Sequence, residues 1–351
     1  MKSSAIHTWL LALLALLGAA SCTNDLPRAE LNLPPQLIVN GVFAADDSVK
    51  AVHFYLTGPA HPKPVQQATV EVYVNGQLRE TVEATSPTDS TQIPGYWALV
   101  STKSAYLKSQ FRPGDEVRLK VSANAGAYRA EAVCQVPKVA GQIAAVDTTS
   151  VLERSRYNEY PETMHYTLHL HDVRGEDNFY RFVFADTAHK GWTETLVNGE
   201  KTTYWKNEPT VYRQYDAKGE ILLTEGRSES ETNPLDGIVM TFPNRSAVFS
   251  DALFRDGSYP LKISAPRRAM LRGRPFMYDI EKSRVSFRLL TLPKTYYYYL
   301  RALNTLYDGE ELESIGEPVK LPSNVEGGTG ILGIYITHEV VLPIGFAVYR
   351  E

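Results

Sequence analysis

The stretch that indicates the fold class is ATVEVYVNGQLRETV, residues 68–82. Val70, Val72 and Val74 alternate with more polar neighbours, which is the period-two pattern of a strand with one buried face. Asn75 and Gly76 follow directly, and both central positions of a tight hairpin turn require positive φ, which this dipeptide tolerates well. The stretch therefore predicts an antiparallel β-hairpin.

Short strands with the same alternation are predicted on both sides of this hairpin. They are separated by Gly-, Pro- and Asn-containing turns, so that seven strands fall within about 100 residues, as in an antiparallel sandwich. The additional strands are predicted at residues 36–43, 51–57, 96–100, 117–121 and 128–136. Residues 36–138 are therefore predicted to form an N-terminal β-sandwich.

The second half, residues 139–351, predicts another β-sandwich with an irregular insert at about 186–260. Strands are expected at 164–170, 179–185, 285–289 and 296–303, with a hairpin formed by 211–215 and 221–223 and a short helical turn at 251–254. Residues 299–319 resemble the last strand pair of a fibronectin type III sandwich. The predicted fold class is all-β, with two antiparallel β-sandwich domains of immunoglobulin or fibronectin III type in tandem.

Residues 1–21 have the features of a bacterial signal peptide. Lys2 supplies a positive start, and residues 9–17 form an apolar segment too short to span a bilayer as a permanent helix. The small residues 18–21 before Cys22 resemble a lipobox, which implies cleavage before Cys22 and its acylation by palmitate or a related chain. The alternative is an ordinary signal peptide with an incidental Cys.

The residues from Cys22 to 35 indicate the membrane in which the protein is anchored. Residues 22–35 are polar and proline-bearing, and they predict a short tether from a membrane. Thr23 stands where an Asp would mark retention in the inner membrane of some bacteria. We therefore expect a lipid-anchored protein of the outer membrane, facing the periplasm or the cell surface.

Charge and cysteine content exclude several classes of protein. Asp and Glu number 40 against 36 Lys and Arg, so the chain has no net positive field to recruit nucleic acid. The 2 Cys residues rule out a disulfide scaffold. Cys134 lies on the apolar face of the predicted 128–136 strand and is expected to be a buried, unreactive side chain.

Three histidines form the strongest candidate for a metal site. His165, His169 and His171 share one face of the predicted 164–170 strand, and imidazoles two residues apart on a strand can bind one metal ion. The alternative is a polar strand face in water, which we favour because a third ligand must come from elsewhere. We expect no cofactor.

Aromatic residues within the insert are candidates for a binding surface, because loops carried by a rigid scaffold often hold recognition residues. The alternative is a small satellite core beneath the insert. The residues are Trp192, Tyr204, Trp205, Tyr212 and Tyr215.

A glycine-rich segment near the C-terminus carries a family resemblance. Asn324, Gly327, Gly328 and Gly330 precede an apolar, β-branched run, so a strand follows the glycines and not the helix that a phosphate-binding loop requires. The glycines are expected to serve backbone turns or close packing. The segment resembles the ending of a Bacteroidota lipoprotein family known as domain of unknown function 4249. That resemblance implies no established activity and implies an association with TonB-dependent outer-membrane transporters.

These observations favour a non-enzymatic function. The sequence holds no His-Glu-x-x-His, Gly-x-Ser-x-Gly, Walker or Cys-x-x-Cys motif. The leading expectation is an accessory or ligand-binding lipoprotein that works with a TonB-dependent transporter. Two alternatives stay open: an envelope hydrolase with its site in the 186–260 insert, and a purely structural envelope protein.

Overall fold

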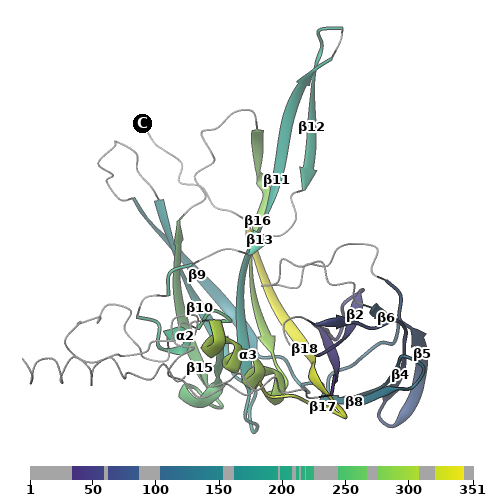
Figure 1. Cartoon of the computed structure of the whole chain (residues 1–351). Helices are drawn as coiled ribbons and strands as arrows, with labels where there is room; N and C mark the ends of the chain where they lie inside the picture. Colours follow the sequence, from purple (N-terminus) through teal and green to yellow (C-terminus); the bar gives the residue numbers. More distant parts are fainter. Residues whose placement is uncertain are drawn as a thin grey trace, which may run out of the picture.

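The structure is a computed structural model of the 351-residue chain, and it is dominated by β-strands (Figure 1). It describes residues 34–58, 62–86, 103–152, 162–196, 198–207, 211–212, 215–217, 219–224, 244–266, 276–307 and 321–343. The predicted signal peptide, Cys22, nearly all of the tether and the 96–100 strand lie outside these residues.

The first half of the chain folds largely as its alternation predicts. Its described strands are β1 (Leu37–Ala44), β2 (Lys50–Leu56), β3 (Lys63–Pro64), β4 (Ala68–Val74), β5 (Gln77–Glu83), β6 (Lys103–Leu107), β7 (Glu116–Ala123) and β8 (Tyr128–Gln135). The β4–β5 hairpin is confirmed, and its turn residues Asn75 and Gly76 have φ values of 51° and 77°. Strands β4, β5, β7 and β8 form one sheet, which packs against β1 and β2 through the alternating apolar residues.

The second half contains longer strands. Its described elements are β9 (Gln142–Leu152), β10 (Glu162–His171), β11 (Phe179–Thr195), β12 (Lys201–Asn207), β13 (Val211–Tyr212), α2 (Ile221–Thr224), β14 (Val248–Ser250), the 3-10 turn η1 (Asp251–Leu253), β15 (Ser258–Pro266), β16 (Phe276–Thr291), α3 (Lys294–Tyr307), β17 (Val325–Glu326) and β18 (Gly328–Pro343). The expected helical turn at 251–254 is confirmed by η1.

A second core lies between the sheet β15-β10-β9 and the strands β11 and β16. Tyr166 on β10 packs against Phe287 and Phe184 at ring-centroid distances of 4.9 and 5.7 Å. Burial of a side chain of this size stabilises the fold by roughly 1.5–3 kcal/mol. This core therefore combines aromatic and aliphatic side chains from the facing sheets.

The last strand, β18, belongs to both halves of the molecule. Its residues 328–335 pair with β1 in parallel, and its residues 336–343 pair with β16 in antiparallel orientation. β18 therefore runs between the two halves (Figure 1). The prediction of purely antiparallel sheets is wrong at this point, because a strand from the chain's end is inserted beside its first strand and the sheet becomes mixed.

The boundary predicted at residue 138 separates the chain in sequence but not in space. Leu332, Ile334 and Ile336 of β18 are buried in the first core together with residues of β1 and β2. β17 also extends the N-terminal sheet by pairing with β8. The first core is thus completed by the C-terminal end of the chain.

The strand predicted at 296–303 is wrong, because this segment lies in the helix α3. Tyr296, Tyr297 and Leu300 are buried against the outer face of the β11–β16–β18 sheet, at a spacing that matches a helix. Tertiary packing therefore overrides the preference of tyrosine for strands. The resemblance of 299–319 to a fibronectin strand pair fails for the same reason at 299–307, and residues 308–320 lie outside the described part.

The insert is more regular than predicted. Residues 179–195 form one continuous strand, β11, which pairs with β12 as a long hairpin that projects from the body (Figure 1). The hairpin expected between 211–215 and 221–223 is wrong, since β13 pairs with β11 and residues 221–224 form the short helix α2. Glu220 at the start of α2 accepts hydrogen bonds from the Tyr259 hydroxyl and from the backbone N–H of Lys262, which ties α2 to β15.

Candidate functional site

A pocket of about 440 Å³ lies over the β11–β16–β18 sheet, with its floor on the face that points away from the second core. Residues of the second core also line it, namely Phe182, Phe184, Tyr215 and Ala247. Residues in register on neighbouring strands point to the same side of a sheet, so the register defines which side chains form the pocket floor. The floor consists of two rows, Arg181–Leu290–Thr337 and Val183–Arg288–Glu339.

Two turns form the walls of this pocket. The turn after β1 contributes Asp46 and Asp47, and a hydrogen bond of 2.7 Å from the Ala44 N–H to Asp47 Oδ2 holds that turn. The turn before β14 contributes Arg245 and Ser246. The pocket is therefore assembled from both ends of the chain and from its middle.

One ion pair crosses the floor. Arg288 Nε donates to Glu339 Oε1 at 2.8 Å, and the Ser286 hydroxyl donates to the same oxygen. Partial burial alone would raise the pKa of Glu339, but the two hydrogen bonds and the charge of Arg288 outweigh it and lower that pKa below its ordinary value. Glu339 is therefore ionised at neutral pH, and its charge is matched by Arg288.

Arg181 differs from Arg288 in its partners. Its Nε donates to the backbone carbonyl of Ser246 at 3.1 Å, and no described carboxylate lies within ion-pair distance of it. The side chain is half-buried. The floor thus carries one guanidinium whose described contacts are neutral.

These charged residues were not predicted as a site. Arg181 and Arg288 each stand between two apolar neighbours in their strands, and Glu339 is the one Asp, Glu, Lys or Arg residue of β18. The signal in the sequence is the parity of each residue along its strand, which places it on one face. Their meeting depends on the order of β11, β16 and β18, and that order is set by strand pairing between distant segments.

The predicted histidine face is present as a strand face. His165 and His171 are exposed on β10, while His169 is half-buried and forms a 2.8 Å contact with Asp147 of the adjacent strand β9. In the described part of the chain, no three His, Cys, Asp or Glu side chains gather closely enough to hold a metal ion. Zinc binding by these histidines stays a prediction.

The five aromatic residues of the insert do not form one surface. Tyr204 and Trp205 are exposed on β12, at 39% and 45% of their full area, and Trp192 lies opposite Tyr204 in the β11–β12 register. Tyr212 lies in β13, beside β11. Tyr215 instead packs against two phenylalanines of the second core, so for this residue the satellite-core alternative is correct.

The glycine motif is a close-packing device, as predicted. Gly330 has φ of +120°, and a Cβ at this position would lie 2.2 Å from the carbonyl oxygen of Val39 on β1. Gly327 has φ of +73°, and a Cβ there would lie 2.8 Å from the carbonyl oxygen of Arg129. At Gly328, a Cβ would lie 2.3 Å from the Leu37 carbonyl oxygen. These glycines allow β18 to lie directly against its neighbours.

Asn324 fastens the same segment. Its Oδ1 accepts from the Leu332 N–H at 2.9 Å, and its Nδ2 donates to the Leu332 and Val133 carbonyls at 2.8 and 2.7 Å. Asn40 acts similarly from β1, accepting from the Ile331 N–H at 3.1 Å. The side-chain amides thus replace backbone partners where β17 turns into β18, and the motif has a structural role.

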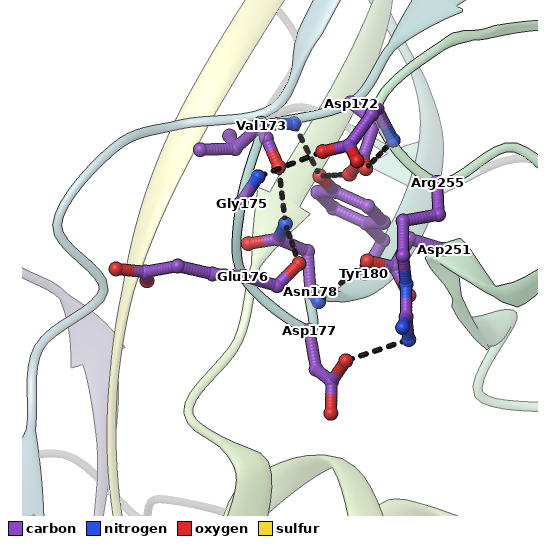
Figure 2. Close-up of polar contacts among 10 residues, drawn as sticks. Asp172, Val173, Gly175, Glu176, Asp177, Asn178, Tyr180, Asp251 and Arg255 are labelled. Atoms are coloured by element: carbon purple, nitrogen blue, oxygen red, sulfur yellow. Dashed lines mark hydrogen bonds and ion pairs between the residues drawn. The ribbon is translucent and has the colours of Figure 1, made fainter.

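A polar cluster joins the β10–β11 loop to η1 (Figure 2). The Tyr180 hydroxyl donates to Asp172 Oδ1 at 2.6 Å, and the Asp256 N–H donates to Asp172 Oδ2 at 2.9 Å. The buried Asp251 accepts from the Asn178 N–H at 2.9 Å. Burial and the bond to Asp172 raise the pKa of Tyr180. The cluster is satisfied internally, so we interpret it as a structural element.

Cys134 is buried on β8, as predicted. Burial raises the pKa of its thiol to about 12, although a hydrogen bond from the Ile334 N–H partly opposes that rise. A thiol with such a pKa is unreactive at neutral pH. Within the described residues, none of the helices is long and apolar enough to cross a bilayer.

Comparison with models of protein families shows which family this chain belongs to. The family model described as domain of unknown function (DUF4249) matches residues 25–339. The chain belongs to this family. The resemblance expected from the glycine motif is thereby confirmed. No curated protein matches the DUF4249 chain.

A search of solved structures finds a distant match. A DUF4785 family protein from Legionella pneumophila subsp. pneumophila str. Philadelphia 1 aligns at 8% identity with a TM-score of 0.21. The alignment covers 73% of the DUF4249 chain and 52% of that protein, so this chain spans about half of its length. A TM-score this low carries no argument about fold or function.

Proposed function

We propose that this DUF4249 protein is a non-enzymatic binding lipoprotein, anchored in the outer membrane through Cys22, that works with a TonB-dependent transporter. The observation that carries the proposal is the pocket over the β11–β16–β18 sheet. Its floor is a set of hydrogen-bonded strands and its walls are turns, which is the arrangement of a rigid scaffold that presents a binding site.

The proposed anchor fits this role. Acylation of Cys22 would hold the chain at a membrane, and residues 22–35 would act as a short tether between the lipid and β1. Two β-sandwich units of immunoglobulin or fibronectin III type, linked through β18, would then form the body that carries the pocket.

The projecting β11–β12 hairpin supports the partner part of the proposal. Tyr204 and Trp205 are exposed on it, and exposed aromatic side chains are enriched at protein interfaces. The hairpin would contact the transporter while the pocket holds a ligand. The hydrolase and the purely structural protein stay alternative predictions.

The test is a pull-down of the tagged full-length protein from detergent-solubilised outer membranes. We expect a stoichiometric β-barrel partner with the native chain and its loss with Cys22→Ala, which keeps the folded body but removes the anchor. Trp205→Ala in the anchored protein should reduce capture if the hairpin is the contact. Recovery of the anchored protein without a partner would refute the transporter association.

A further inference from the structure

The pocket floor carries a positive charge at Arg181 that is not balanced by a described carboxylate. The Nε of Arg181 is occupied by the carbonyl of Ser246, which is a neutral acceptor. By contrast, Arg288 in the same pocket is paired with Glu339, and Arg118 on the N-terminal sheet is paired with glutamates. Partial burial of a guanidinium without a paired anion costs desolvation free energy, and an anion that binds to it would offset part of this cost through charge-assisted hydrogen bonds.

The positive charge of Arg181 affects the pKa of two neighbouring tyrosines. Burial raises the pKa of both Tyr215 and Tyr296, and the positive charge of Arg181 opposes that rise at each of them. Tyr215 also lines the pocket. The guanidinium therefore acts electrostatically on its surroundings in the pocket, where part of the solvent is excluded.

The pocket is also charged unevenly along its length. Arg181 lies on β11, whereas Asp46 and Asp47 lie beyond β1, three strands further along the sheet. Three strand spacings amount to about 14 Å. An anionic group is therefore favoured at the Arg181 end and disfavoured at the other end.

The space between these ends is partly apolar. Val183 and Leu290 lie on the floor, and Tyr335 lies toward β1. A volume of about 440 Å³ is in the range of pockets that hold small molecules. The shape and lining thus suit a ligand with one anionic group and an apolar body.

We propose that this pocket binds a small organic anion, with its single carboxylate or phosphate group on Arg181 and its apolar body over Val183, Leu290 and Tyr335. The inference deepens the proposed function, because it names the ligand class of the binding module. Both oxyanions match the two-pronged hydrogen-bonding geometry of a guanidinium.

The test is isothermal titration calorimetry on the full-length protein in detergent, with benzoate, phenyl phosphate and inorganic phosphate as probes. We expect saturable one-to-one binding of benzoate or phenyl phosphate, and weaker binding of inorganic phosphate, which lacks the apolar body. A preference between the two aromatic probes distinguishes a carboxylate ligand from a phosphate ligand.

Two variants and one control locate the binding. Arg181→Gln should weaken binding by about tenfold to a hundredfold, because one charge-assisted pair is lost. Thr337→Trp should abolish it by filling the floor without touching Arg181, which covers the case in which the first variant folds poorly. Arg118→Gln, an equal change of charge on the distant N-terminal sheet, should leave binding unchanged.

Either of two results would overturn the inference. One is the lack of saturable binding of benzoate and phenyl phosphate at concentrations up to about 10 mM. The other is equal binding by the native protein and both pocket variants. Transporter capture in the pull-down is measured separately, so failure of the ligand inference leaves that proposal standing.

Discussion

Gly330→Ala is expected to be among the most damaging small substitutions in this protein. Gly330 lies within the parallel β1–β18 pair, which connects the two cores. A Cβ would lie 2.2 Å from the Val39 carbonyl oxygen and 2.8 Å from Asn40 Oδ1, and the backbone has φ of +120°. The methyl group therefore meets backbone, which cannot move aside as a side chain can.

The cost follows from two terms. A strained backbone conformation for a residue with a Cβ costs about 1–3 kcal/mol. Displacement of the paired strands costs about 1–3 kcal/mol more. The sum, about 2–6 kcal/mol, is a large share of the roughly 5–15 kcal/mol by which a native protein is typically stable.

Urea unfolding, followed by tryptophan fluorescence and by circular dichroism, measures this loss. Gly76→Ala is the matched control, because Gly76 also has positive φ, at +77°, but a Cβ there would meet nothing within 4 Å. The control should cost only about 1–2 kcal/mol. Equal unfolding midpoints for the two variants would show that the close approach to Val39 is not limiting.

Three further predictions concern stability. Asn324→Ala removes three hydrogen bonds to the β8 and β18 backbone, including both to Leu332, and should cost about 2–4 kcal/mol in urea unfolding, with Asn324→Asp intermediate. Tyr180→Phe keeps the ring but loses the 2.6 Å bond to Asp172, and a loss of about 1–2 kcal/mol in the same assay is expected; an unchanged midpoint would contradict a structural role for that cluster. Burial lowers the pKa of His53 below 6.5, so as the pH falls the unfolded chain takes up the proton before the folded chain does. The free energy of unfolding should therefore decrease as the pH drops below about 6.5. His53→Gln should flatten this pH dependence between about pH 7.5 and 5, and an equally steep dependence in the variant would refute the reasoning.

The strands of the first half could be predicted because each alternates on its own. The alternating valines of β4 and the Asn75-Gly76 turn are sufficient to predict the hairpin, and it forms as expected. The strand expected at 296–303 could not be distinguished from a helix in this way, because tyrosine runs satisfy both patterns. Its helical state follows from packing against Leu290 and Ile331 on the sheet.

The candidate pocket could not be predicted from the sequence for a different reason. Its floor joins residue 181 to residues 288 and 339 through strand pairing over more than a hundred positions. A single sequence indicates that each residue faces one side of its strand, and it contains no information on which strand lies beside it. The different environments of the insert's aromatic residues could not be predicted for the same reason. Tyr215 packs against the second core and Trp205 is exposed to solvent, and only the packing of the strands shows this.

The β-rich class, the Asn75-Gly76 hairpin turn, the burial of Cys134 and the structural use of the glycines could be predicted from the sequence alone, because each depends on residues that are adjacent in the chain. By contrast, the tertiary structure was needed to show that β18 pairs with the first strand, that residues of β18 contact both cores, and that Arg181 lines a pocket. The physical reason is that alternation and turn chemistry act over a few residues, whereas strand order is chosen by the burial of whole sheet faces.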